Sequence, residues 1–544
     1  MIGTDNYTER RQDWTATQTL NDPDGRYAEV IHNVNEVTAN LIINAERNLS
    51  EDLYLDTRIG SEVQKREYRM NEAIAPGLSV PGVYSITNSS VRQTLDDHKS
   101  NKRINSLFGA ATLGFRDYLY LDLTARNDWS STLPAENNSY FYPSASLSFI
   151  FTDAFNIQQD WLTYGKIRGG WTQVGNDTDP YQLRASYNSI EPFGDVPSYS
   201  LDETIPNTQL KPESIESFEF GAELRFFNNR LGLDATYYNQ TTTDQILPVQ
   251  ISRASGYVEQ IINAGKVENK GVELALNATP VQTPALRWDV VVNWSKNNNE
   301  VVELVEDLDA LILGDTWDTT VEARPGEEFG TLYGTGFVRD EQGNIVVGDD
   351  GVPLIDSELR PFGSFQADWK GGISNTISYK NLQLGFLIDM KYGGKLSSVT
   401  YMFGRYTGIL EETLEGREGG YVFDGGRWAD GAVKQDGTPN DIETDAQTFN
   451  LDTFFGNSES HIFDATYVKL REVRLAYSLP VRWLSNIPFR SVDLGLVGRN
   501  LWIIHKEVPH IDPESAFNTG NVQGLESNQF PSVRSVGFNV RFTL

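Results

Sequence analysis

Hydrophobic and polar side chains alternate along most of this 544-residue chain, with the period of two that a β-strand produces. In residues 117–128, Leu119 and Leu121 lie on one face, whereas Tyr120 and Asp122 lie on the other. The pattern predicts about fifteen strands, each of the length that a tilted strand needs to cross a lipid bilayer. The predicted strands cover residues 34–45, 52–63, 104–115, 117–128, 142–152, 164–175, 215–227, 230–241, 267–279, 286–298, 365–379, 382–392, 466–479, 490–502 and 533–544.

The two faces of these strands differ in a way that indicates a membrane barrel. The polar face carries charged residues on strand after strand, as a water-filled lumen allows, and the apolar face is rich in aromatic residues. Aromatic residues also border the link between the strands 117–128 and 142–152, which is typical of the interface between lipid and water. No run of about 18 apolar residues is present, so a membrane role requires strands.

The links between the predicted strands alternate between short and long from residue 46 onward. Tight periplasmic turns and large extracellular loops give a barrel this alternation, which a soluble sandwich has no reason to follow. We therefore expect an all-β fold, a transmembrane antiparallel β-barrel with long extracellular loops and short periplasmic turns. The last strand would descend from a long loop, with Val536 and Phe538 facing outward, and end in the periplasm. Short links are expected at 46–51, 116, 153–163, 228–229, 280–285, 380–381 and 480–489, and long links at 64–103, 129–141, 176–214, 242–266, 299–364, 393–465 and 503–532.

One predicted strand, 466–479, changes phase along its length. Val468 and Leu470 share one parity, whereas Leu475 has the other. A β-bulge adds one residue to one strand of a pair and would restore the common facing of these side chains. We expect this bulge near Arg471 and Glu472.

A series of short motifs resembles SusC/RagA-type TonB-dependent transporters of the bacterial outer membrane. The motifs follow the order of that family from about residue 100 to the C-terminus, so the resemblance covers most of the chain. They lie at 126–134 (Arg-Asn-Asp-Trp-Ser-Ser-Thr-Leu-Pro), 139–144 (Ser-Tyr-Phe-Tyr-Pro-Ser), 165–176 (Gly-Lys-Ile-Arg-Gly-Gly-Trp-Thr-Gln-Val-Gly-Asn), 210–214 (Leu-Lys-Pro-Glu-Ser), 263–273 (Asn-Ala-Gly-Lys-Val-Glu-Asn-Lys-Gly-Val-Glu), 465–473 (Ala-Thr-Tyr-Val-Lys-Leu-Arg-Glu-Val), 498–501 (Gly-Arg-Asn-Leu) and 512–514 (Asp-Pro-Glu).

The resemblance implies an organisation larger than this chain. Transporters of this type close with about 22 strands and carry a signal peptide, a lumen plug and a TonB-contacting segment before the barrel. The sequence shows fewer strands, and residues 1–11 lack the apolar core of a signal peptide. We therefore expect residues 1–544 to be the C-terminal part of the barrel, with the plug and the signal peptide absent from this chain.

The resemblance also implies a function and a set of partners. The expected function is active import of glycan or peptide oligomers across the outer membrane. The expected partners are a SusD-like surface lipoprotein, the TonB–ExbB–ExbD complex through the N-terminal part, the lipid bilayer with its lipopolysaccharide, and the oligosaccharide or peptide substrate. Two alternatives remain open, a passive porin-like or adhesin surface barrel and a barrel hydrolase with its site in an outer loop.

Composition excludes other classes of function. Acidic residues outnumber basic ones 75 to 45, and the formal net charge is -30, so nucleic acid is not an expected partner. Cysteine is absent, which excludes disulfides, thiolate nucleophiles and cysteine-ligated metals within this chain. No nucleophile elbow with a partnered histidine and no phosphate-binding glycine loop is present, so we do not expect an enzyme.

Two groups of residues are candidates for contact with other molecules. Lys166 and Arg168, two residues apart in a strand, share a face and would point into the lumen, where they contact the plug or line the wall. Aromatic residues of the long loops are candidates for stacking on sugar rings, although each of them is also suited to packing the loops together. This second group comprises Trp317, Tyr333, Tyr401, Tyr406, Tyr421 and Trp428.

No cofactor is expected, and structural Ca²⁺ in the loops is a weaker possibility. Residues 349–351 and 436–441 could place several oxygen atoms around such an ion, but neither stretch has the spacing of an EF-hand. The related stretch 339–345 favours turns built from Asp-Gly and Gly-Asn pairs instead. His510 and Asp512 are too few ligands for a zinc site.

Overall fold

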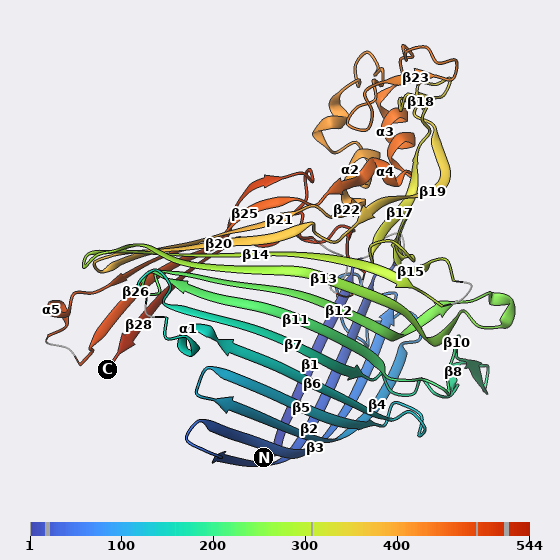
Figure 1. Cartoon of the computed structure of the whole chain (residues 1–544). Coiled ribbons are helices and arrows are strands. Elements are labelled where there is room, and N and C mark those ends of the chain that lie inside the picture. Colours follow the sequence, from blue (N-terminus) through green and yellow to red (C-terminus); the bar gives the residue numbers. More distant parts are fainter. Residues whose placement is uncertain are drawn as a thin grey trace. The chain divides into compact units, whose positions relative to one another are not determined.

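The computed structural model describes residues 2–16, 22–157, 159–305, 308–485, 488–515, 520 and 522–544. Its chain divides into two compact units. Unit 1 comprises residues 1–148, 170–217 and 242–264, and unit 2 comprises residues 149–169, 218–241 and 265–544. Long antiparallel strands dominate both units, as the alternation of the sequence predicts (Figure 1).

Unit 1 contains a ladder of five strands, each paired with the next in the chain. Their pairing is antiparallel throughout, and β2 and β3 are in continuous register from Arg26 opposite Pro76 to Asn48 opposite Tyr54. A short parallel pairing joins β10 to β13, and β8 and β9 form a hairpin in the following loop. The elements that begin in this unit are β1 (Ile2–Thr15), β2 (Arg26–Asn48), β3 (Leu53–Pro76), β4 (Thr94–Phe115), β5 (Leu119–Ser130), β6 (Ser139–Ile150), β8 (Tyr187–Phe193), β9 (Val196–Leu201), β10 (Thr204–Ile205), β11 (Glu213–Phe226), η1 (Arg253–Ser255) and β13 (Glu259–Gln282).

Unit 2 contains a second antiparallel ladder, in which the strands pair in the order β13, β14, β20, β21, β25, β26 and β28. Two short helices lie in links on the opposite side from the long loops. Among the described residues, no helix is both long enough and apolar enough to cross a membrane. The elements are α1 (Phe151–Ala154), β7 (Tyr164–Asn176), β12 (Leu231–Gln250), β14 (Leu286–Glu303), β20 (Trp369–Tyr379), β21 (Leu382–Tyr392), β25 (Tyr467–Ser478), α5 (Val481–Leu484), β26 (Ser491–Lys506) and β28 (Ser535–Thr543).

The two faces of this ladder have opposite character, as predicted. In β21, Leu382 and Leu384 lie on the outer face and are more than a third exposed, whereas Gln383 and Asp389 lie on the inner face. In β28, the outward residue Phe538 is 66% exposed. A continuous exposed apolar face of this extent is costly in water and favourable in lipid, so the outer face is the membrane-facing one.

The predicted β-bulge is confirmed at Arg471. In the β21–β25 ladder, Leu387 is opposite Glu472 and the next residue, Ile388, is opposite Leu470, so Arg471 is left without a partner. The extra residue places Leu470 and Leu475 on the same face, as inferred from the phase change.

The strand lengths correct the sequence-based prediction. All fifteen predicted strands are present, but several extend well beyond the predicted ends, so the links predicted at 64–103, 129–141 and 242–266 shrink to 77–93, 131–138 and 251–258. The strand β1 was not predicted, although it pairs with β2 along its whole length. The physical reason is the same in both cases, because these segments carry polar residues on both faces and therefore lack the alternating hydropathy pattern.

The long links of unit 2 fold into a compact body that we call the loop domain, residues 308–364 and 393–466 (Figure 1, upper right). Its core is aromatic and includes Phe337, Tyr401, Phe423, Phe449 and Phe454. Its elements are β15 (Leu311–Thr316), β16 (Thr319–Ala323), β17 (Thr331–Phe337), β18 (Ile345–Val347), β19 (Ile355–Ser364), β22 (Lys395–Ser398), α2 (Val399–Tyr406), η2 (Glu411–Leu414), β23 (Ala432–Lys434), α3 (Ala446–Phe454), α4 (Ser458–His461) and β24 (Ile462–Asp464), and β22 also pairs with β27 (Leu525–Glu526).

Candidate functional site

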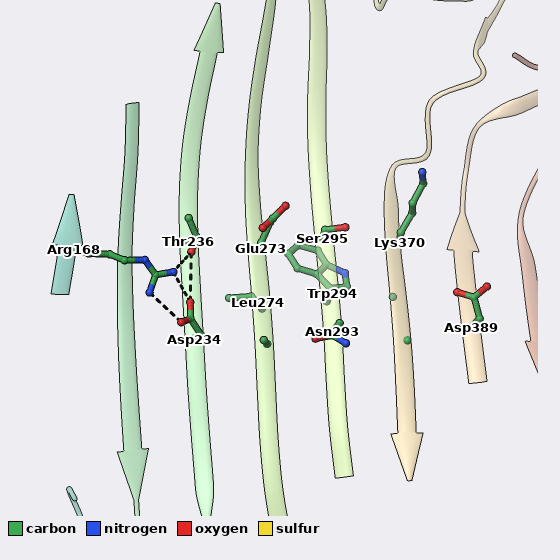
Figure 2. Close-up of a pocket in the computed structure, with 13 residues that line it drawn as sticks. Arg168, Asp234, Thr236, Glu273, Leu274, Asn293, Trp294, Ser295, Lys370 and Asp389 are labelled. Carbon is green, nitrogen blue, oxygen red and sulfur yellow. Dashed lines mark hydrogen bonds and ion pairs between the residues drawn. The ribbon is translucent and has the colours of Figure 1, made fainter. Parts of the chain in front are cut away.

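A polar cavity of about 540 Å³ lies on the inner face of unit 2 and is lined by residues of six strands (Figure 2). In two of these strands the polar lining residues lie two positions apart, Asp234 and Thr236 in one and Asn293 and Ser295 in another, as the period of a β-strand requires for side chains on one face. Its polar lining consists of Arg168 of β7, Asp234 and Thr236 of β12, Glu273 of β13, Asn293 and Ser295 of β14, Lys370 of β20 and Asp389 of β21.

Arg168, which the sequence predicts to face the lumen, lies at one end of this cavity. Its guanidinium donates two hydrogen bonds to Asp234, at 3.0 and 2.8 Å, and a third to the hydroxyl of Thr236 at 2.7 Å. Gly221 makes room for it, since a Cβ at that position would lie 2.7 Å from the Arg168 Nε. Both members of the ion pair are about one third exposed, so the pair orients Arg168 more than it stabilises the sheet. Lys166 lies two residues earlier on the same strand and outside the lining of the cavity.

A charged network begins at the other end of the cavity, at Asp389. Arg471, the bulge residue, donates to Asp389 from Nε at 3.1 Å and to Glu514 from Nη1 at 2.8 Å. Lys469 pairs with the same Glu514 at 2.5 Å and with Asp512. The bulge therefore has a function in the fold, because it directs Arg471 to two carboxylates on separate segments.

This network joins three of the sequence motifs. Lys469 and Arg471 belong to the motif 465–473, and Asp512 and Glu514 belong to the motif 512–514. Arg471 also donates to the side-chain oxygen of Asn500, from the motif 498–501, at 3.1 Å. The motifs thus fasten the segment that follows β26 to the barrel wall.

A second hydrogen-bond network, in unit 1, involves the motif 126–134. Asp177 accepts hydrogen bonds from Lys102 at 2.5 Å, from Thr132 at 3.2 Å and from Ser130. Asp177 is 9% exposed, so these three donors compensate a carboxylate that is largely removed from water. Asp177 directly follows the motif 165–176, so the two motifs meet here.

The remaining motifs of unit 1 also contact one another. The side chain of Asn263 accepts a hydrogen bond from the backbone N–H of Lys211 at 2.9 Å and donates one to the Lys211 carbonyl at 2.8 Å. Beside this pair, Leu133, Leu210 and Ile261 form a small buried apolar cluster. Sequence reasoning identified these motifs but did not pair them, because contacts between distant segments depend on the strand register.

The six aromatic candidates of the long loops separate into two groups. Tyr401 and Tyr333 are buried, at 6% and 4% exposed, and Tyr421 and Trp428 are partly buried against the core of the loop domain. Trp317 and Tyr406 are 60% and 39% exposed.

Trp317 and Tyr406 belong to an exposed aromatic cluster that sequence reasoning did not assemble. Its other members are Phe403 and Phe455, with ring centroids 4.9 Å from Trp317 to Phe403 and 5.2 Å from Tyr406 to Phe455. The members come from a loop, from α2 and from the end of α3, so only the folded loop domain brings them together.

The acidic stretches considered for Ca²⁺ form turns. The Asp350 carboxylate accepts the backbone N–H of Val352, and the Asp436 carboxylate accepts that of Thr438. Gly351 and Gly437 have φ values of 78° and 82°, which glycine adopts without strain. In the described part of the chain, no group of three or more acidic, histidine or cysteine residues is placed to hold a metal ion.

Comparison with known proteins decides the family. The family model described as "TonB dependent receptor-like, beta-barrel" matches residues 2–325, more than half of the chain. The chain belongs to this family. The family is one of non-enzymatic outer-membrane proteins, so the protein is a TonB-dependent receptor barrel of the outer membrane and not an enzyme.

The relatives confirm the SusC-like character inferred from the motifs. "TonB-dependent receptor P26" of Formosa agariphila is 26% identical over 537 residues, which cover 89% of this chain and 51% of that protein. "TonB-dependent receptor SusC" of Bacteroides thetaiotaomicron is 28% identical over 307 residues, which cover 52% of this chain and 30% of that protein. The chain thus spans about half the length of P26 and a smaller part of SusC.

The solved structures confirm the fold. "Structure of the RagAB peptide transporter" superposes with a TM-score of 0.80 and 20% identity, over 99% of this chain and 59% of that one. The same complex in an "open-open" state superposes with a TM-score of 0.77. These similarities establish a RagA-like barrel architecture for the chain.

Proposed function

We propose that the protein is an active importer of glycan or peptide oligomers across the outer membrane. The family membership carries this proposal, since the matching barrel is that of TonB-dependent receptors. The polar inner face of unit 2 supports the proposal. The apolar outer face of the strands contacts lipid, whereas a charged and hydrated inner face provides a path for polar cargo across the membrane.

Two partners follow from the same proposal. A SusD-like surface lipoprotein would deliver cargo to the extracellular side, where the loop domain lies. The TonB–ExbB–ExbD complex would supply energy through the N-terminal part that the family resemblance implies. In support of this proposal, the chain resembles the structure titled "Structure of the RagAB peptide transporter" in fold, and "TonB-dependent receptor SusC" is among its relatives.

The residues proposed for this function fall into the two groups described above. Trp317 and Tyr406 present exposed rings, so we propose that the cluster of Trp317, Phe403, Tyr406 and Phe455 contacts cargo at the cell surface. Tyr333, Tyr401 and Tyr421 would act indirectly, by holding the loops in place. Lys166 and Arg168 would face the lumen contents, with Arg168 oriented by Asp234.

The test is the uptake of oligomers in a strain from which the gene is deleted. We expect the strain to lose growth on the oligosaccharides or oligopeptides that the parent uses, and to keep growth on the corresponding monomers, which diffuse through porins. Complementation with the wild-type gene should restore growth. The double variant Trp317→Ala, Tyr406→Ala should restore it only in part, and Tyr187→Ala, which removes an exposed tyrosine from a different loop, should restore it fully. Unchanged growth of the deletion strain on all oligomers would contradict the proposal.

A further inference from the structure

The outer face of unit 1 changes from apolar to charged along β3 and β4. Ile59 and Val63 of β3 and Leu107 of β4 lie on this face, and each is more than a third exposed. The opposite face of the same ladder carries the ion pair of Arg126 with Glu62. The apolar face is therefore the one that contacts lipid.

The ring of Trp129 marks the edge of this apolar band. Trp129 of β5 is opposite Asn105 of β4, which is in turn opposite Val63 of β3, so the three residues form one row across the sheet. Tryptophan is typical of the interface between lipid and water. The next residues on this face of β3 and β4 are Lys65 and Arg103, about 7 Å beyond the row.

Two pairs of cations face each other across β3 and β4 in this region. Lys65 is opposite Arg103, and Arg69, four residues further along β3, is opposite Lys99. Side chains that are directly opposite in antiparallel strands have Cβ atoms about 5 Å apart, and like charges in such positions repel each other. We call these four residues the basic patch. Two opposed pairs of cations on one face favour an anion beside them.

Carboxylates on the same face compensate two of the four cations. Lys65 pairs with Glu67 at 2.5 Å, and Arg69 pairs with Asp97 at 3.0 Å. All four side chains are at least 40% exposed, so water screens both pairs and they add little to stability. These carboxylates account for half of the positive charge of the basic patch.

The other two cations, Lys99 and Arg103, form no ion pair within the described part of the chain. Arg103 donates from Nε to the side-chain oxygen of Asn105 at 3.1 Å, which leaves its terminal nitrogens available. The charge of Lys99 also acts on Glu67 and Asp97, but each of these carboxylates already has a cation of its own. The chain has a formal net charge of -30, so a local excess of cations beside the lipid-facing band is a specific feature of this surface.

We propose that the basic patch binds the phosphate groups of the glycolipid of the outer leaflet, through its lipid A part. The patch lies towards the longer link, residues 77–93, which the alternation of links places outside the cell. Lipid A carries its phosphates where the acyl chains end, at the level expected next to the row of Trp129. Arginine and lysine bind phosphate through charge-assisted hydrogen bonds, and basic residues beside a membrane attract anionic lipid.

An acidic segment of a soluble protein fits this surface less well. Lys65 is only two residues beyond the lipid-facing Val63, so the patch begins within the layer of lipid headgroups. The proposal concerns lipid and not cargo. It therefore goes beyond the proposed function and does not depend on import.

The test is native mass spectrometry of the full-length protein, purified in detergent and titrated with diphosphoryl lipid A. We expect lipid A to bind, and lipid A without its phosphates to bind at least 10-fold more weakly. The double variant Lys99→Gln, Arg103→Gln removes the two cations without an ion pair and leaves both existing pairs intact, so it should weaken binding about 10- to 100-fold. The control Arg482→Gln, Arg490→Gln removes the same charge from exposed positions on the side of the short links and should leave binding unchanged.

Several outcomes would overturn the inference. These are no binding of lipid A, equal binding of its dephosphorylated form, equal affinity of the Lys99→Gln, Arg103→Gln variant, and equal binding of phosphatidylethanolamine. Displacement of lipid A by an equal concentration of inorganic phosphate would assign the patch to the free ion, and displacement by an acidic oligopeptide would assign it to a protein. Resistance of the variant to unfolding in SDS at room temperature, equal to that of wild type, would establish that its barrel is folded.

Discussion

At the scale of the residue, the ion pairs of Lys469 fasten a loop segment to the barrel wall. Its side chain is 3% exposed and pairs with Asp512, which is 5% exposed, and with Glu514. Lys469→Met leaves both carboxylates without this cation, and we expect a loss of about 3 kcal/mol of stability. Because the pair fastens the segment after β26, trypsin should cleave the variant faster after Lys506 and Arg534.

The control for this prediction is Lys434→Met. Lys434 also pairs with a carboxylate, Asp441, at 3.0 Å, but Asp441 is 77% exposed. An exposed pair contributes at most about 1 kcal/mol, so the tryptic pattern should match that of the wild type. Equal protease resistance of Lys469→Met and Lys434→Met would show that the network does not hold the segment.

Glu459 gives a prediction about pH. Burial alone would raise the pKa of this carboxyl, but hydrogen bonds from Arg339 and from the backbone N–H of Phe337, together with the charge of Arg360, lower it below its ordinary value. A carboxyl with a lowered pKa stabilises the fold above its unfolded pKa of about 4.3, and this contribution disappears as the pH falls through the folded value.

We therefore expect Glu459→Gln to destabilise the loop domain by about 3 kcal/mol at neutral pH, since it leaves two arginines without their anion. The difference from wild type should be constant between about pH 6 and 8 and should shrink below about pH 4.5. Chemical denaturation followed by tryptophan fluorescence at pH 7 and pH 3.5 measures this difference. If the difference in unfolding free energy between wild type and Glu459→Gln grew on acidification, the lowered pKa of Glu459 would be contradicted.

Contacts between individual residues of distant segments could not be predicted from the sequence. The motifs containing Lys469, Asn500 and Asp512 could be recognised, but nothing in their spacing shows that they meet, because the register of β25 and the path of the segment after β26 decide it. In the same way, the sequence names Trp317 and Tyr406 as aromatic loop residues. Only the folded loop domain shows that they are exposed while Tyr401 is buried.

At the scale of the element, the strands were predictable because each has one face in lipid. Alternation identified all fifteen predicted strands, and the phase change in β25 identified its bulge. Strand ends and β1 were not predictable, since both faces of these segments carry polar residues. The loop domain was not predictable as a compact body, because its aromatic core is assembled from segments that hydropathy alone cannot place together.

If the core of the loop domain is independent of the strands, the loop domain should unfold while the barrel remains folded. Phe337 is fully buried there, with its ring 5.4 Å from that of Trp428. Phe337→Ala should cost about 3 to 5 kcal/mol. Limited proteolysis should then show faster cleavage within residues 393–466, while the barrel keeps its resistance to unfolding in SDS at room temperature.

The matched control is Phe193→Ala, which removes the same side chain from a position that is 87% exposed. It should not change the rate of cleavage in the loop domain. Loss of SDS resistance in Phe337→Ala would instead show that the loop domain and the strands unfold together.

At the scale of the whole molecule, the alternation of short and long links predicts which side of the membrane each link faces. The loop domain should lie outside the cell and the turn at 283–285 in the periplasm. This chain contains no cysteine, so Gln435→Cys in the loop domain and Ala285→Cys in the turn each introduce a single site. A membrane-impermeant maleimide should label Gln435→Cys in intact cells and Ala285→Cys only after the outer membrane is permeabilised. The opposite pattern would reverse the proposed orientation.

Energised transport is the central claim, because it separates an importer from a passive porin-like barrel of the same fold. The most direct measurement is the initial rate at which intact cells accumulate a labelled oligomer that the deletion strain does not take up, before and after a protonophore collapses the inner-membrane proton gradient. We predict that collapse of the gradient abolishes accumulation, and that cells lacking TonB behave in the same way. Uptake that continues at the same rate without the gradient would contradict the account and would favour a passive barrel.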